Sequence, residues 1–447
     1  MSESILYYFT DAVLRAPTIG CMLMCFAAAL VGVIVFLRKQ SLLGESLSHA
    51  AYPGVIIGVL FAGILSLNEE QETSLAILIM FGAFLSTIAG LWAINFLERR
   101  LNVRSDSALC FVLSAFFGIG LTLASEVQFS YSTLYRQVQV YLYGQAATMT
   151  DVYIVIYGAL SIIVLLVVIF FYKEIQAISF DRNYAQSLGI NTKGIDAIIF
   201  ILIVFAVVIG IRSVGVVLMS AMLIAPAAAA RQFTNKLYLM FALAGFFGLL
   251  SGFFGNYFSV EWTNSLAIMY PTAKLTLPTG PMIVMVASFI CLISLLFAPN
   301  RGLMLRLARI GRFRYKCVCE NVLKAIWRQD VNGEVAFEAI AKYQSSSSLY
   351  LRCILLSLAH QGWVDHSSSG FYQLTPEGRL WAARIVRLHR LWEVYLVDYL
   401  GVGAERVHRN AEEMEHIITP ELERELTLLL KDPKQDPHQQ PIPPKEL

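Results

Sequence analysis

The chain of 447 residues has little charge: only 15% of its residues are Asp, Glu, Lys or Arg, whereas 57% are hydrophobic. A soluble domain carries about a quarter charged residues, so this composition argues against an ordinary soluble protein and indicates a membrane protein. The seven cysteines have no paired spacing typical of a disulfide framework, and we expect reduced thiols. No G-x-x-x-x-G-K-[ST] motif and no nucleophile beside a base is found, so we expect no enzyme and no ATPase site.

Long apolar runs fill the chain up to about residue 300 and are absent beyond it. A membrane-spanning helix needs about 20 mostly apolar residues. Basic residues follow every second run, which by the positive-inside rule predicts an outside N-terminus and a cytoplasmic C-terminal part. The expected fold class is mainly α, with a polytopic membrane domain over 1–300 followed by a soluble part. The nine expected spans are 16–37, 42–66, 74–96, 107–125, 152–172, 195–211, 214–230, 237–255 and 280–298.

Two polar segments of this half are candidate functional elements. Glu45 and His49 are four residues apart, so they share one helix face and could offer ligands to a cation, or Glu45 could reach the interface while His49 packs. The connection 173–194 is long and partly amphipathic, which fits either an ordinary loop helix or a helix that docks on a soluble partner.

Three stretches carry a resemblance: SLLGESLSHAAYPG (41–54), FDRNYAQSLGI (180–190) and GVVLMSAMLIAPAAAARQFT (215–234). They resemble ABC permeases that import manganese, zinc or iron. The resemblance implies a second permease subunit, a separate ABC ATPase subunit and an extracytoplasmic metal-binding protein. It also implies that Asp181, Ala185 and Gly189 belong to the ATPase-coupling helix, and it supports Glu45 and His49 as part of a transport path.

The soluble part begins with a basic linker at 301–319 and continues with a helical pattern from Glu320. A serine-rich turn precedes a helix that ends near Gly362, and two short apolar stretches then flank a His-Ser-Ser-Ser-Gly turn. This order over 320–380 predicts a winged helix-turn-helix that binds DNA, or one that contacts only protein. Arg352 is the main basic residue of the expected recognition helix, whose DNA-contacting candidates are Ser348, Leu349, Arg352 and Cys353.

Histidines and carboxylates gather at ligand spacing in the last part of the chain, 381–447. His389 and Glu393 are four residues apart, and a second group is spaced 4, 3 and 1. Imidazole combined with carboxylate suits a divalent first-row ion, Mn(II), Fe(II) or Zn(II). The candidate ligands are His389, Glu393, His408, Glu412, Glu415 and His416.

The stretches HRLWEVYLVDYLG, VHRNAEEMEH and DPHQQPIP resemble the DtxR/MntR-type metalloregulators. The resemblance implies a repressor that forms a homodimer through its C-terminal domain, and it implies the same six ligands. The family's N-terminal ligand falls at Asn321 and a companion at Lys324, which departs from the family's pattern. Two functions follow: a metal importer fused to a metal-dependent repressor of operator DNA, or a transporter whose C-terminal domain gates it without binding DNA. A repressor held at the membrane searches DNA poorly, so we expect cleavage near 301–319 to release a cytoplasmic C-terminal fragment.

Overall fold

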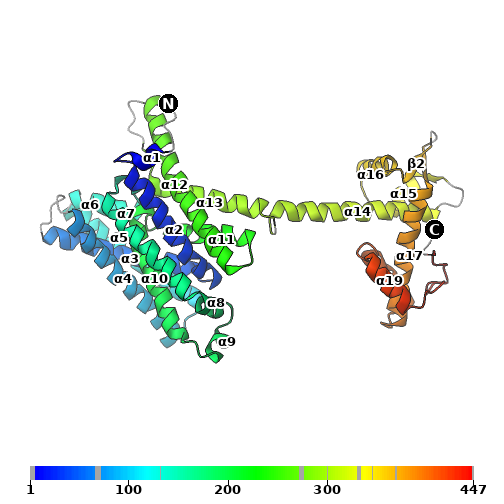
Figure 1. The fold of residues 1–447 in the computed structure, drawn as a ribbon, viewed down its shortest axis with the longest axis horizontal. Helices are drawn as coiled ribbons and strands as arrows, with labels where there is room; N and C mark the ends of the chain where they lie inside the picture. The colour runs from blue at the N-terminus through cyan, green and yellow to red at the C-terminus, as the bar shows by residue number, and fades with distance from the viewer. Residues whose placement is uncertain are drawn as a thin grey trace. The chain divides into compact units, whose positions relative to one another are not determined.

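The computed structural model describes residues 6–65, 72–130, 132–270, 276–299, 301–329, 334–344, 346–367 and 370–444. Two compact units make up the chain, residues 1–305 and residues 306–447 (Figure 1). We call them the membrane unit and the C-terminal unit.

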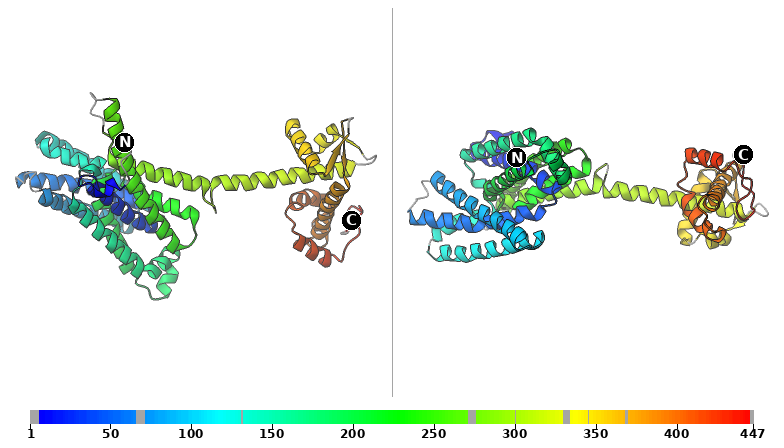
Figure 2. Two further views of the ribbon diagram at one scale, coloured as in Figure 1. Left: turned by 45° about the horizontal axis from the view of Figure 1, so that its top comes forward. Right: turned by 90° about the horizontal axis from the view of Figure 1, so that it is seen from below.

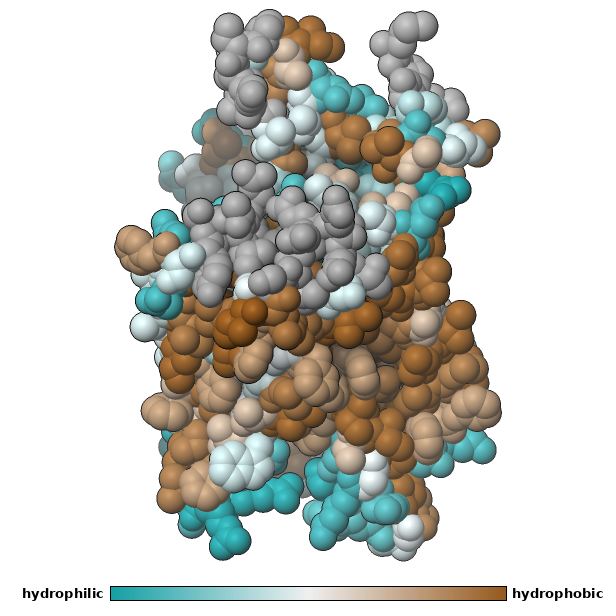
Figure 3. Space-filling view, turned by 90° about the vertical axis from the view of Figure 1, so that its left-hand side faces the viewer, coloured by the Kyte–Doolittle hydropathy of each residue, from teal (hydrophilic) through white to brown (hydrophobic). Residues whose placement is uncertain are grey.

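Within the described residues, eight helices of the membrane unit are long and apolar enough to cross a membrane, which confirms eight of the expected spans. Large apolar side chains on their outer faces, such as Trp92 and Phe170, are exposed, and Figure 3 shows a hydrophobic band between more polar ends. An apolar belt of this kind suits the hydrocarbon core of a bilayer. The eight helices are α2 (Arg15–Leu37), α3 (Ser41–Ile64), α4 (Glu72–Arg100), α5 (Ser105–Ser130), α7 (Asp151–Phe170), α10 (Thr192–Val214), α12 (Leu237–Met269) and α13 (Thr279–Phe297).

The seventh expected span, 214–230, is wrong as a full crossing. Its residues contribute to α11 (Met219–Phe233), which has 15 residues and is therefore only about 22 Å long. Gly215 has a φ of +96° and ends α10, so the helix is interrupted within this apolar run before α11 begins. Met219, Met222 and Leu223 are buried in the core of the bundle, which explains why the segment is apolar without spanning.

Glycines bring the central helices of the membrane unit into backbone contact. A Cβ built on Gly32 of α2 would lie 1.8 Å from the carbonyl oxygen of Leu223 in α11. A Cβ built on Gly54 of α3 would lie 2.1 Å from the carbonyl oxygen of Gly82 in α4. Small residues at helix crossings are typical of membrane bundles, where close van der Waals packing drives association. The remaining helices of the unit are α1 (Tyr7–Thr10), α6 (Ser132–Tyr143), η2 (Ala146–Thr148), α8 (Tyr172–Phe180) and α9 (Arg182–Ser187).

The first part of the C-terminal unit is a winged helix, as predicted. Helix α14 (Leu303–Gln329) is followed by β1 (Val335–Ala336), α15 (Phe337–Tyr343), α16 (Ser348–His360), β2 (Val364–His366) and β3 (Phe371–Leu374). The strands form an antiparallel sheet in the order β1-β3-β2. The stretch 301–319, expected as a linker, is helical from Leu303 and continuous with the helix expected from Glu320. Buried Val322, Ile326, Ile354 and Leu358 are part of the winged-helix core.

Helix α17 (Pro376–Asp398) links this winged helix to the last helices, α18 (Ala404–Met414) and α19 (Pro420–Leu429), as Figures 1 and 2 show. Thr375 caps α17 by accepting a hydrogen bond from the Gly378 amide at 3.0 Å, and Pro376 occupies the first helical turn. Leu388 and Leu391 bury one face of α17 against residues of the C-terminal segment. Another face of α17 carries the polar side chains described next.

Candidate metal centre

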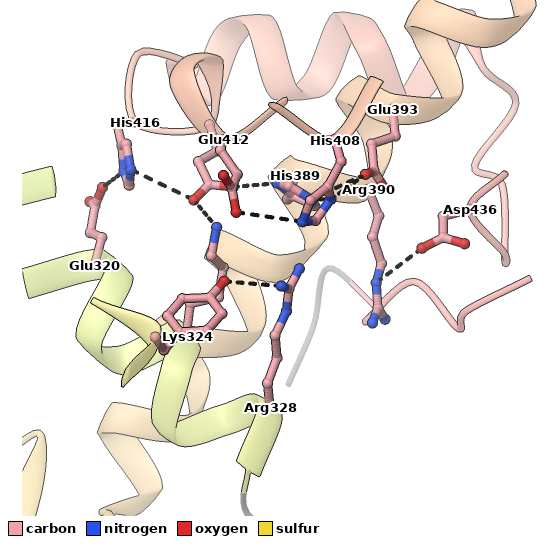
Figure 4. Close-up of polar contacts among 12 residues, drawn as sticks. Glu320, Lys324, Arg328, His389, Arg390, Glu393, His408, Glu412, His416 and Asp436 are labelled. Carbon is pink, nitrogen blue, oxygen red and sulfur yellow. Dashed lines mark hydrogen bonds and ion pairs between the residues drawn. The ribbon is translucent and has the colours of Figure 1, made fainter. Parts of the chain in front are cut away.

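Three elements bring the candidate ligands of the C-terminal unit together (Figure 4). Helix α17 carries His389 and Glu393 on one face, since they are one helical turn apart. Helix α18 packs against α17 and carries His408 and Glu412, and Glu415 follows as its C-cap. Helix α14 contributes Lys324, whose position the resemblance had already associated with the site, and Glu320, which the sequence did not predict there.

His389, Glu393 and His408 form one compact cluster. The Glu393 Oε1 atom lies 3.2 Å from His389 Nε2 and 2.9 Å from His408 Nδ1, and the two ring nitrogens lie 3.0 Å apart. Adjacent ligands of an octahedral ion with bonds of about 2.1 Å lie about 3 Å apart, so these three atoms fit one face of a first-row divalent ion. Two of the three side chains are buried, and His408 is half exposed. We call His389, Glu393 and His408 the metal triad.

A cavity of about 540 Å³ adjoins the metal triad. Asp436 and His438 of the C-terminal segment also line it, and Asp436 is held there by Arg390 at 3.4 Å. The cavity gives the triad access to solvent and room for the remaining ligands of an ion. These two residues were not among the predicted site residues, although they lie in the DPHQQPIP stretch that carries the resemblance.

The other three predicted ligands, Glu412, Glu415 and His416, have different partners. Glu415 is fully buried, and its Oε1 accepts a hydrogen bond from the Lys324 ammonium at 2.5 Å while its Oε2 lies 2.5 Å from His389 Nδ1. His416, just after α18, places its Nδ1 2.6 Å from Glu320 Oε2 of α14. Within α18, Glu412 Oε1 lies 3.5 Å from His408 Nε2. None of the three lines the cavity beside the triad.

The charges of this network set its protonation. Burial acts to raise the pKa of Glu393, but hydrogen bonds from His389 and His408 outweigh it and lower that pKa to about 2. The pKa of Glu415 is also lowered, because the His389 hydrogen bond and the Lys324 charge exceed the effect of its burial. For His389, burial acts to lower the pKa, and the hydrogen bonds with Glu393 and Glu415 raise it above the usual value. Both carboxylates are therefore ionised at neutral pH, as metal ligands or their anchors require.

The predicted DNA-contacting residues lie together on α16. Ser348, Leu349, Arg352 and Cys353 are all exposed, because Leu351 and the later apolar positions turn the opposite face into the core. The Arg352 guanidinium lies 5.4 Å from the centre of the Phe337 ring. The exposed face of α16 is otherwise strongly apolar, with Leu349 at 78% and Leu356 at 71% exposure.

In the membrane unit, His49 is buried on α3 with its ring edge against Phe117, and its Nδ1 has no hydrogen-bond partner among the described residues. Glu45, one turn earlier, is partly exposed, and no ion pair between the two is present within the described residues. The two side chains share a helix face as the spacing predicts, and whether a cation passes them stays a prediction.

The expected coupling segment folds as the short helix α9. Asp181 caps it by accepting a hydrogen bond from the Tyr184 amide at 3.0 Å, and Gly189 follows it with a φ of +77°. Ala185 is buried in the bundle, so its side chain is not available to a soluble partner. The exposed apolar side chains here are Tyr184 and Leu188, both at 58% exposure.

Comparison with known proteins gives a family match in each unit. Residues 10–298 match the ABC 3 transport family, and residues 375–444 match the metal binding and dimerisation domain of iron dependent repressors. The chain is 37% identical to a probable metal transport system membrane protein of Chlamydia trachomatis, over 97% of each chain. It is 34% identical to the manganese transport system membrane protein MntC of Bacillus subtilis, over 86% of this chain and 84% of that one. The solved structure of PsaBC from Streptococcus pneumoniae in complex with Fab is similar with a TM-score of 0.55 and 25% identity, covering 66% of this chain and 96% of that chain.

Proposed function

The chain belongs to the ABC 3 transport family, and we propose that its membrane unit is the permease of an importer for manganese or iron, with zinc as a third candidate cargo. We further propose that its C-terminal unit is a metal-dependent repressor of operator DNA. The observation that carries the second half is the metal triad, because its three ligand atoms have the spacing that one divalent ion requires. The two units would then handle the same ion, one as cargo and the other as signal.

The donor atoms favour manganese or iron as the signal. Two imidazole nitrogens and one carboxylate oxygen, with no thiolate, suit Mn(II) and Fe(II) better than the sulfur-rich structural sites typical of zinc. The Bacillus subtilis relative is named for manganese transport, which supports the same ion for the permease. When bound, the ion would supply a fixed cross-link between α17 and α18.

In the repressor, the exposed face of α16 would enter the major groove through Ser348, Leu349, Arg352 and Cys353. A homodimer formed through the C-terminal domain would set the spacing of two such helices, as the match to a dimerisation domain suggests. Release of the C-terminal unit by cleavage within 301–319 would let it search DNA in the cytoplasm. Because this stretch is part of α14, the cleaving protease would have to unfold a helical turn first.

A second candidate function is a metal-sensing gate that does not bind DNA. The observation in its favour is the composition of the exposed face of α16, where Arg352 is surrounded by exposed leucines. Phosphate contacts by Lys and Arg supply most of the affinity of DNA-binding proteins, so such a face predicts weak DNA binding and better protein binding.

For the permease, the exposed pair Tyr184 and Leu188 would dock on a separate ABC ATPase subunit, with Asp181 and Gly189 holding the ends of α9. The transport path would pass Glu45 and His49, whose free ring nitrogen could accept a dehydrated cation. A second permease subunit and an extracytoplasmic metal-binding protein complete the importer. The site of action is the bacterial inner membrane, with the C-terminal unit in the cytoplasm.

The test uses residues 306–447, which have their own buried core, and fluorescent DNA from upstream of the gene. Mn(II), Fe(II) and Zn(II) are titrated anaerobically and DNA binding is followed by anisotropy. We expect metal-dependent binding that His408→Ala abolishes and that Glu425→Gln, an exposed position on α19, leaves intact. Metal binding without affinity for this DNA or for genomic fragments would favour the gate, and no metal binding at all would refute the metal centre.

A further inference from the structure

Lys324 on α14 is one of the largest fully buried side chains of the chain's described part, although lysine is rarely buried without a partner. Its side chain is 1% exposed and its ammonium lies 2.5 Å from Glu415 Oε1, whose side chain has no exposure. This ion pair joins the winged helix to the end of α18.

The pair leaves no place for a metal ion on Glu415. A metal ion bound to a carboxylate oxygen lies about 2.1 Å from it, and here the ammonium already occupies the side of Oε1. A divalent ion added there would lie within about 5 Å of a buried positive charge, where repulsion is poorly screened. The second oxygen is taken by His389 Nδ1 at 2.5 Å. His416 Nδ1 lies 2.6 Å from Glu320 Oε2, and its Nε2 lies 3.6 Å from the same Glu415 Oε1 that the Lys324 ammonium contacts, so an ion on this ring nitrogen would also meet the buried positive charge.

We propose that Lys324 is a built-in cation that anchors Glu415, and that Glu415 is a positioning residue for the metal ligand His389 instead of a ligand itself. This inference rests on the proposed metal triad. The Glu415 carboxylate accepts the Nδ1–H of His389, so in the neutral ring that a metal ion requires, the lone pair of Nε2 is directed at Glu393 and His408. Carboxylates that hold a metal-binding histidine in this way fix its tautomer and its ring orientation.

Two consequences follow for the C-terminal unit. It binds one ion per chain at the triad, because the other three predicted ligands are held by Lys324, Glu320 and His408 or are directed away from the cavity. The winged helix is also tied to the metal ligand by the chain of contacts from Lys324 through Glu415 to His389. A bound ion is therefore connected to α14 through the Lys324 ammonium, and not through a metal ligand on that helix.

The test counts Mn(II) bound at saturation by the full chain in lipid nanodiscs, so that ions held by the membrane unit cancel between variants. His408→Ala is expected to lose one ion per chain. Glu415→Gln and His416→Ala are expected to retain the wild-type count, with the affinity of Glu415→Gln reduced roughly 10- to 100-fold, as for other second-sphere changes. Loss of an ion at saturation in either of these two variants would overturn the inference while leaving the triad intact. No loss in His408→Ala would instead refute the triad itself.

A spectroscopic readout and a double variant separate positioning from folding. The pulsed electron-spin-echo signal of the bound Mn(II) should contain two histidine nitrogens and remain unchanged in His416→Ala. Lys324→Met should weaken Mn(II) binding, and adding it to Glu415→Gln should cause no further loss, since both act through one contact. A third histidine nitrogen that disappears in His416→Ala, or additive losses in the double variant, would contradict the proposal.

Discussion

Replacing Lys324 with methionine removes the ammonium from a pair that is buried on both sides. The Lys324 side chain is 1% exposed and Glu415 is not exposed at all, so the remaining carboxylate would stay in a place that water does not reach. Removing one partner of a buried ion pair costs about 3 to 5 kcal/mol, and the lower end applies here because His389 still contacts Glu415. We therefore expect the free energy of unfolding of the C-terminal unit to fall by about 3 kcal/mol. For a unit of this length that corresponds to a decrease in Tm of roughly 10 °C.

The measurement is urea unfolding of residues 306–447 without metal, followed by tryptophan fluorescence, since Trp327, Trp363, Trp381 and Trp392 lie in this unit. Lys342→Met is the matched control, because Lys342 is exposed on α15. The double variant Lys324→Met with Glu415→Gln should recover most of the stability, since no buried charge is then left unpaired. A loss in Lys324→Met as small as in Lys342→Met would refute the buried pair as the link between α14 and α18.

Three further outcomes are expected. The pKa of His389 is raised and Mn(II) needs its neutral ring, so Mn(II) affinity should rise with pH, and the midpoint of this rise should lie above the ordinary histidine pKa of about 6.5. Glu415→Gln should move this midpoint to lower pH. Calorimetry between pH 6 and 8.5 checks this, and an unchanged midpoint in Glu415→Gln would contradict it. Gly54→Ala should abolish folded membrane protein, because the new Cβ would meet a backbone oxygen at 2.1 Å, whereas Gly118→Ala has nothing within 4 Å and should yield wild-type amounts in detergent by size-exclusion chromatography. Leu188→Asp should reduce metal uptake with normal membrane abundance if this exposed side chain docks on the ATPase, and unchanged uptake in cells would remove it from the coupling surface.

The sequence was sufficient for the parts of the fold that depend on local pattern. Twenty-residue apolar runs predict spanning helices because the bilayer demands both length and internally satisfied backbone groups, and eight of the nine runs are confirmed. The run at 214–230 failed because a buried helix inside a bundle is as apolar as a span, so composition cannot distinguish them. The wing strands and α16 were predictable from turn residues and caps, which act within a few positions of the chain.

The site shows the opposite dependence on tertiary contacts. Helical spacing placed His389 with Glu393, and His408 with Glu412, because residues four apart share a face. Spacing could not reveal that Lys324, 91 positions before Glu415, would bury its ammonium against that carboxylate. Nor could it reveal that Ala185 faces the bundle while Tyr184 and Leu188 face outward. The sequence by itself determined which donor atoms and which helices exist. Only the packing of α14, α17 and α18 decided which donors face a cavity and which are held by other protein charges, since that depends on groups brought together from distant parts of the chain.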